Sequence, residues 1–167
     1  MKHTRSAGKV ILFGVVCALC MALAGCSSSS STPNPDDPAS QNREYMSQLN
    51  QQMDSIQGSL NDFQDAVAKN DVVTMQADKT AVEKTIDSVK ATSVTDRLSD
   101  VKDGYVSALD ALDDALASYL SLYTDVQNGT VSSDDYAQRL KGVQDAYDSA
   151  VSQMQDADDA VVAVANE

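Results

Sequence analysis

The sequence of 167 residues predicts an all-α fold, and three observations carry this prediction. Residues 39–167 contain no proline, so long helices can run through them without a break. Apolar residues in this region recur at alternating gaps of three and four positions, the spacing of amphipathic helices with heptad stripes. Alternating β-branched runs, which are typical of strands, do not occur. We therefore expect an antiparallel up-down-up-down four-helix bundle with coiled-coil-like packing over residues 42–167.

The first two helices of this bundle are expected at about residues 42–69 and 71–91. The apolar stripe of the first helix is Met46, Leu49, Met53, Ile56, Leu60, Phe63 and Val67. The stripe of the second helix is Val72, Met75, Val82, Ile86 and Val89, with Lys79 in one core position. Asn70 or Asp71 can cap the start of the second helix, because a short polar side chain accepts a bond from an unpaired backbone N–H.

Two longer helices are expected at about residues 95–127 and 133–165. The third stripe is Leu98, Tyr105, Leu109, Leu112, Leu116, Tyr119, Tyr123 and Val126, with Lys102 as its polar exception. The fourth stripe is Tyr136, Leu140, Val143, Tyr147, Ala150, Met154, Ala157, Val161 and Val164. Ser93 or Thr95 can cap the third helix, and Gly129 suits its left-handed end. Ser132 and Asp135 form a capping box for the fourth helix.

The expected helices differ in length. At about 1.5 Å per residue, the last two helices are roughly 45–50 Å long, whereas the second is only about 30 Å long. One end of the long pair must therefore protrude or be covered by the first helix alone.

The region before residue 42 has a different character. Lys2, Arg5 and Lys9 precede an uncharged apolar stretch of 16 residues, 10–25, which is shorter than the roughly 20 residues that span a bilayer. This order is typical of a signal peptide, which we expect at residues 1–25. Residues 26–41 are rich in serine and contain all three prolines, so we expect a disordered tether there.

Residues 23–26 read Leu-Ala-Gly-Cys and resemble the lipobox of bacterial lipoproteins. The resemblance implies cleavage between Gly25 and Cys26 by signal peptidase II and a diacylglyceryl lipid on Cys26, usually joined by a palmitate-type N-acyl chain. It also implies a lipid anchor at the extracytoplasmic face of the cell membrane, or of an outer membrane if the envelope has two. The motif covers only this N-terminal region, and we identify no family motif in the helical remainder, so the resemblance concerns processing and location alone.

Charge and composition exclude several functions for the cleaved chain. It retains nine basic and 25 acidic residues, a formal charge of −16. This charge argues against nucleic acid as a partner because phosphates require a basic surface, and a basic partner would suit it. Membrane attachment should depend on the lipid alone.

Cleavage also removes His3, Cys17 and Cys20, and lipidation consumes Cys26, so no histidine or free thiol remains. We therefore expect no catalytic triad, no zinc or copper site, no cofactor besides the lipid, and no enzyme activity. Acidic clusters occur, but none follows the ligand spacing of a calcium loop. They are Asp110, Asp113 and Asp114; Asp134 and Asp135; and Asp156, Asp158 and Asp159.

Candidate binding residues are five tyrosines and two lysines: Tyr105, Tyr119, Tyr123, Tyr136, Tyr147, Lys79 and Lys102. Their positions on the apolar stripes favour a core role for the tyrosines, and a stacking surface is the alternative. A lysine on such a stripe reaches the bundle edge unless an acidic residue pairs with it inside.

We therefore expect a lipid-anchored, non-catalytic extracytoplasmic bundle that binds an envelope protein or polymer. The alternative is a small-molecule-sensing or cargo-binding module with a pocket between helices. A cavity that interrupts the core favours the alternative, whereas a solid core with an exposed apolar or tyrosine groove favours partner binding.

Overall fold

The computed structural model describes residues 37–165, so the predicted signal peptide, Cys26 and most of the tether lie outside the described residues. Within this range the chain forms four α-helices and no strand. The helices are α1 (Pro38–Lys69), α2 (Val72–Ala91), α3 (Ser99–Gln127) and α4 (Ser133–Ala165), and a short 3₁₀ turn, η1 (Asp96–Leu98), precedes α3. The all-α prediction is therefore confirmed for the described part of the chain.

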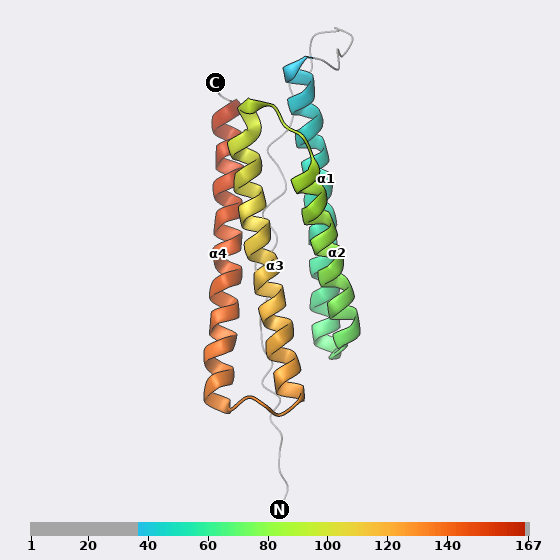
Figure 1. Cartoon of the computed structure of the whole chain (residues 1–167), viewed down its shortest axis with the longest axis vertical. Coiled ribbons are helices and arrows are strands. Elements are labelled where there is room, and N and C mark those ends of the chain that lie inside the picture. Colours follow the sequence, from blue (N-terminus) through green and yellow to red (C-terminus); the bar gives the residue numbers. More distant parts are fainter. Residues whose placement is uncertain (1–36, 166–167) are drawn as a thin grey trace, which may run out of the picture. The chain divides into compact units, whose positions relative to one another are not determined.

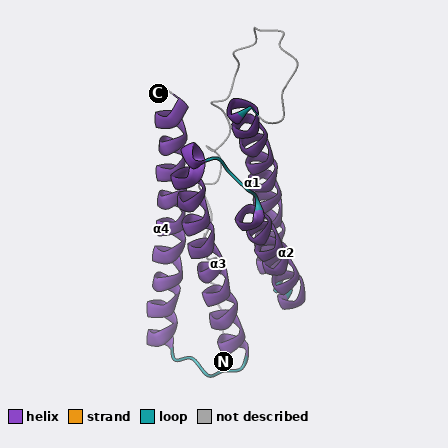
Figure 2. Cartoon of the chain, turned by 45° about the horizontal axis from the view of Figure 1, so that its top comes forward, coloured by secondary structure: helices purple, strands orange, loops and turns teal. Residues whose placement is uncertain are grey.

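Each helix runs back along the one before it (Figure 1). α1 packs on α2, α2 on α3, and α3 on α4, and the contact between α3 and α4 is the most extensive. Figure 2 shows the same succession of helices from a second direction, with the loop after α2 leading across to α3. A single apolar cluster takes buried residues from all four helices, among them Ile56, Val82, Leu109 and Ala150.

The start of α1 differs from the prediction. The helix begins at Pro38 rather than at residue 42, so the end of the expected tether is helical. The backbone N–H of Ser40 donates to the side chain of Asp37, which caps the helix, at 3.2 Å. A proline is tolerated in the first turn because its missing N–H would have no partner there. Pro38 therefore starts a helix instead of extending the tether.

The turn between α1 and α2 is made by Asn70 and Asp71. Asn70 adopts the left-handed conformation, with φ of 57°, and ends α1. The Asp71 carboxylate accepts from the backbone N–H of Thr74 at 3.1 Å and caps α2. Hydrogen bonds from the Thr74 side chain and backbone to this carboxylate lower the pKa of Asp71. Of the two predicted caps, Asp71 is the one used.

The turn between α3 and α4 has the predicted chemistry. Gly129 has φ of 69°, and its N–H donates to the Val126 carbonyl at 3.1 Å. Ser132 and Asp135 bond to each other, and the Asp135 N–H donates to the Ser132 hydroxyl at 3.2 Å. The predicted left-handed glycine and capping box are both confirmed.

The predicted stripes describe much of the core, and the structure differs from them at several positions, of which two are instructive. Tyr45, which lies one position before the first predicted stripe, is only 2% exposed, and its neighbour Met46 is half-buried. Val126, placed on the third stripe, is 46% exposed because it lies in the last turn of α3. The third helix also begins later than predicted, at Ser99, because residues 96–98 form η1.

Small residues bring α3 and α4 together. A Cβ atom placed on Gly104 of α3 would lie 3.3 Å from the Cβ of Ala157 of α4. Ala108 of α3 and Ala150 of α4 are fully buried. Since small side chains let two helix backbones approach, this spacing accounts for the extensive contact between α3 and α4.

Candidate functional site

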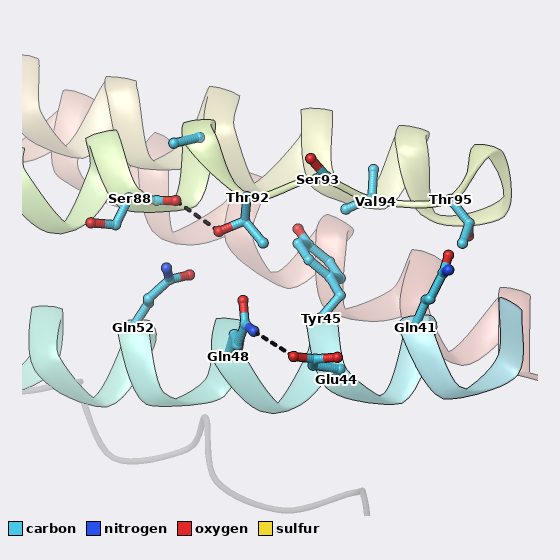
Figure 3. Close-up of a pocket in the computed structure, with 11 residues that line it drawn as sticks. Gln41, Glu44, Tyr45, Gln48, Gln52, Ser88, Thr92, Ser93, Val94 and Thr95 are labelled. Carbon is cyan, nitrogen blue, oxygen red and sulfur yellow. Dashed lines mark hydrogen bonds between the residues drawn. The ribbon is translucent and has the colours of Figure 1, made fainter. Parts of the chain in front are cut away.

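A polar groove lies beside the first turns of α1, at the end of α2 and the linker that follows it. α2 has 20 residues and α1 has 32, and the first turns of α1 line a recess together with the end of α2 and the linker 92–95. We call this recess the α1–linker groove; its volume is about 660 Å³. It is lined by Gln41, Glu44, Tyr45, Gln48, Gln52, Ser88, Ala91, Thr92, Ser93, Val94 and Thr95 (Figure 3).

Tyr45 is the buried anchor of the groove. Its side chain points from α1 toward the linker (Figure 3), and only 2% of the residue is exposed. The hydroxyl is buried and has no hydrogen-bond partner within residues 37–165. Burial, together with the negative charge of Asp103, raises the pKa of Tyr45 to about 12. A buried hydroxyl without a partner is unfavourable, typically by about 1–3 kcal/mol.

Gln52 carries a second unpaired group in the same groove. Its Oε1 atom is buried and accepts no hydrogen bond from the described residues. In Figure 3 the Gln52 side chain projects from α1 toward the end of α2, on the same side as Tyr45. The groove therefore combines a buried hydroxyl and a buried amide oxygen, both without partners in the described part of the chain.

The other polar groups of the groove are held in place. The Thr95 hydroxyl donates to Asn42 Oδ1 at 2.5 Å and ties the linker to α1. Thr92 donates to the Ser88 carbonyl at 2.8 Å. Gln48 Nε2 donates to the carboxylate of Glu44 at 3.3 Å. Glu44 is the one charged residue in the lining, so the walls of the groove consist mainly of amides and hydroxyls.

Lys102 supports the linker from the other side. Its ammonium donates to the Lys90 carbonyl at 2.7 Å and to the Thr92 carbonyl at 2.6 Å. The last carbonyls of a helix lack intrahelical partners, and a positive charge there is favourable. Lys102, a candidate binding residue in the sequence, thus fixes the end of α2 and positions the groove wall.

Lys79 occupies a different place, between α2 and α3. Its ammonium lies 2.6 Å from Glu83 and 2.9 Å from Asp113, and its side chain is 15% exposed. Burial favours loss of the Lys79 proton, but hydrogen bonds to Glu83 and Asp113 outweigh it and raise the Lys79 pKa. Lys79 is therefore half-buried, and it pairs both with Asp113 of α3 and with the more exposed Glu83 of its own helix.

The candidate tyrosines do not gather on one surface. Tyr105 is 5% exposed and its hydroxyl donates to Asp158 of α4, so this residue belongs to the core rather than to a binding surface. Burial and the Asp158 carboxylate raise the Tyr105 pKa. The Tyr119 ring packs edge-on against Phe63 with centroids 5.8 Å apart, and burial raises the Tyr119 pKa.

The remaining three candidate tyrosines are half-buried at other places. The Tyr123 hydroxyl donates to the Asn70 carbonyl at 3.2 Å, which links the end of α3 to the turn after α1. Tyr136 and Tyr147 lie on α4, and burial and Asp148 raise the Tyr147 pKa. A binding role for these three residues stays a prediction.

The acidic clusters are partly used within the chain. Asp113 binds Lys79, Asp110 lies 2.7 Å from Lys90, and Asp158 accepts from Tyr105. Within residues 37–165, no three acidic, histidine or cysteine side chains are grouped as metal ligands would be. None of the described helices combines the length and the apolar composition needed to cross a membrane.

Comparisons of the chain with protein-family models, with curated proteins and with solved structures found no match.

Sequence reasoning missed the α1–linker groove. Tyr45 and Gln52 were not singled out, because neither lies on the predicted stripe of the first helix. The nearest signal in the sequence is the short second helix, which predicts that one end of the long third and fourth helices protrudes or is covered by the first helix alone. The polar side chains at 41, 44, 48 and 52 face that gap at a spacing of three and four, as one face of a helix does.

Proposed function

We propose that this protein is a lipid-anchored, extracytoplasmic, non-catalytic binding module built as an antiparallel up-down-up-down bundle with coiled-coil-like packing. It binds a protein or polymer of the cell envelope. The observation that carries the binding role is the α1–linker groove with its two unpaired buried groups, the Tyr45 hydroxyl and Gln52 Oε1. The Leu-Ala-Gly-Cys motif supports the anchor, and the excess of acidic residues argues against nucleic acid as the partner.

The shape of the groove favours an extended partner. Its lining on α1 runs from Gln41 to Gln52, which corresponds to about 16 Å along the helix axis. This length suits a linear segment of a polymer better than a compact small molecule. The alternative function, a small-molecule-sensing or cargo-binding module, draws on the same recess, whereas Lys79 and Lys102 do not line it.

The anchor is tested by metabolic labelling with a palmitate analogue in bacteria that express the full chain. Wild type and Cys20→Ala should incorporate the label, because Cys20 lies in the segment that is cleaved off. Cys26→Ala should lose the label and accumulate as precursor. Labelling that survives Cys26→Ala would contradict the proposed anchor.

The binding role is tested by photocrosslinking in intact cells. A photoreactive amino acid at Gln48, inside the groove, should capture a discrete envelope component. The matched control is Gln144, an exposed residue of α4 outside the groove lining. Equal capture from both positions, or none from Gln48, would contradict a binding role for the groove.

A further inference from the structure

The chemistry of the α1–linker groove points to the class of its ligand. We propose that the groove binds a neutral, hydroxyl-rich chain, namely a short stretch of saccharide. This inference rests on the proposed binding function and narrows it from envelope partners in general to glycans.

The two unpaired groups set the first requirement. Gln52 Oε1 is an acceptor only, so the ligand must bring a donor to it. The Tyr45 hydroxyl can donate or accept, and it has neither kind of partner within the described residues. A sugar hydroxyl is both donor and acceptor, so the hydroxyls of a short saccharide can provide a donor for Gln52 Oε1 and either kind of partner for Tyr45.

The charge of the groove sets the second requirement. No lysine or arginine is among the lining residues, and the cleaved chain carries a formal charge of −16. Phosphate- or carboxylate-rich polymers would meet no cation in the groove and would be repelled by the protein as a whole. The overall charge attracts cations, but the groove itself offers a cation one carboxylate, that of Glu44, which also accepts from Gln48. The lining is otherwise neutral and hydrogen-bonding, so we take a neutral ligand as the one it fits, with trilysine as the cationic probe that tests this choice.

The groove has few apolar side chains in its lining, which favours a saccharide over a peptide as its ligand. Peptides and proteins are usually held by large apolar or aromatic anchors that fill pockets. Besides Tyr45, whose ring is buried, the only apolar side chains in the lining are Ala91 and Val94. The other lining residues offer amides and hydroxyls, plus the Glu44 carboxylate, which are the groups that pair with sugar hydroxyls.

The linker adds backbone groups to the same surface. Ser93 and Val94 form no hydrogen bond within residues 37–165, so their N–H and carbonyl groups can pair with a ligand. Thr95 and Lys102 hold this linker from both ends. The linker wall of the groove is thus held in place before the ligand arrives, which limits the entropy lost on binding, whereas the buried Tyr45 hydroxyl and Gln52 Oε1 must become accessible as the ligand binds.

The experiment is isothermal titration calorimetry of the soluble chain, residues 27–167, with four probes. Triacetylchitotriose and maltotriose represent saccharides, trilysine represents cationic peptides, and triphosphate represents anions. We expect at least one trisaccharide to bind, with no measurable binding of trilysine or triphosphate. Tyr45→Phe and Gln52→Leu should each weaken the bound saccharide about tenfold, because each removes one hydrogen bond to the ligand.

Tyr119→Phe is the control, since it removes a tyrosine hydroxyl outside the groove and should leave the affinity unchanged. Thermal melting of each variant verifies that it is folded. Binding of trilysine or triphosphate without either saccharide would overturn the saccharide inference and leave the binding module standing. If neither trisaccharide binds, the saccharide inference is wrong. The proposed function fails as well only if a photocrosslinker at Gln48 captures nothing, or captures no more than one at Gln144.

Discussion

The α3–α4 pair and the α1–α2 pair are built differently. α3 and α4 differ by only four residues in length, approach closely at Gly104 and Ala157, and pair the buried Tyr105 hydroxyl with Asp158. α1 outruns α2 and leaves the Tyr45 hydroxyl without a partner in the described chain. The first pair has the features of a rigid support. The α1–α2 pair is less completely packed and hydrogen-bonded at one end, where the groove lies.

Ion pairs connect the two pairs of helices. Lys79 and Lys90 of α2 bind Asp113 and Asp110 of α3. These contacts lie beside the apolar cluster that all four helices share. The α1–α2 pair is therefore held against the α3–α4 pair by ion pairs as well as by buried apolar residues.

The largest expected effect is at the close contact of α3 and α4. Gly104→Leu should lower the free energy of unfolding by about 2–3 kcal/mol, because its side chain would be forced against Ala157. Gly58→Leu on α1 is the matched control, since nothing lies within 4 Å of a Cβ placed there. It should stabilise by about 0.5–1 kcal/mol through helix propensity. Urea unfolding measures both variants, and equal effects would contradict the difference between the pairs.

The second prediction concerns alkaline pH. The Tyr45 pKa is raised from 10.0 to about 12, so folding favours the neutral phenol. Its contribution is therefore complete below about pH 10 and is lost as the pH rises toward 12, which amounts to about 2–3 kcal/mol. Urea unfolding of wild type and Tyr45→Phe between about pH 9 and 12 measures this loss. The difference between the two proteins should widen over that range, and a constant difference would contradict the burial of Tyr45.

The third prediction concerns the charge between the two pairs of helices. Lys79→Ala should destabilise by about 1–2 kcal/mol, because it leaves the half-buried carboxylate of Asp113 without its cation. Lys141→Ala is the control, since Lys141 pairs with Asp145 on the surface and should cost less than about 0.5 kcal/mol. Thermal unfolding at low and high salt distinguishes the two ion pairs, because salt screens a surface pair more than a half-buried one. Equal losses of stability in the two variants would show that the Lys79–Asp113 ion pair contributes no more than a surface ion pair.

The smallest predicted effects are at the two turns. Gly129→Ala should destabilise by about 1 kcal/mol, because φ of 69° is unfavourable for a side chain. Asn70→Gly should stabilise slightly, because glycine adopts the left-handed conformation without a Cβ penalty. The gain should be only a few tenths of a kcal/mol, because asparagine already tolerates this conformation. Chemical denaturation of both variants checks the signs. A stabilising Gly129→Ala would mean that the α3–α4 turn is not as described.

Several features of the fold follow from local sequence. Heptad spacing predicted the four helices, and turn chemistry predicted Gly129 and the Ser132–Asp135 box because each depends on a few neighbouring residues. The start of α1 was missed because a proline marks both an extended chain and a first helical turn.

The groove could be predicted only as an uneven helix end. Whether the Tyr45 hydroxyl finds a partner depends on distant parts of the chain, namely residues 92–95 and α3 near Asp103, which no local pattern specifies. Tyr105 shows the same dependence with the opposite result, because Asp158 of α4 happens to meet it. Residue type alone therefore does not separate a core tyrosine from a groove tyrosine.

The most direct test of this account is the free energy of unfolding of Tyr45→Phe measured beside that of Tyr105→Phe. Tyr45→Phe should be more stable than wild type by up to about 1 kcal/mol, because it removes a buried hydroxyl that has no partner. Tyr105→Phe should be less stable by about 1–2 kcal/mol, because Asp158 loses its donor. If both substitutions destabilise the protein equally, the Tyr45 hydroxyl is paired in the free protein and the α1–linker groove is not held open for a ligand.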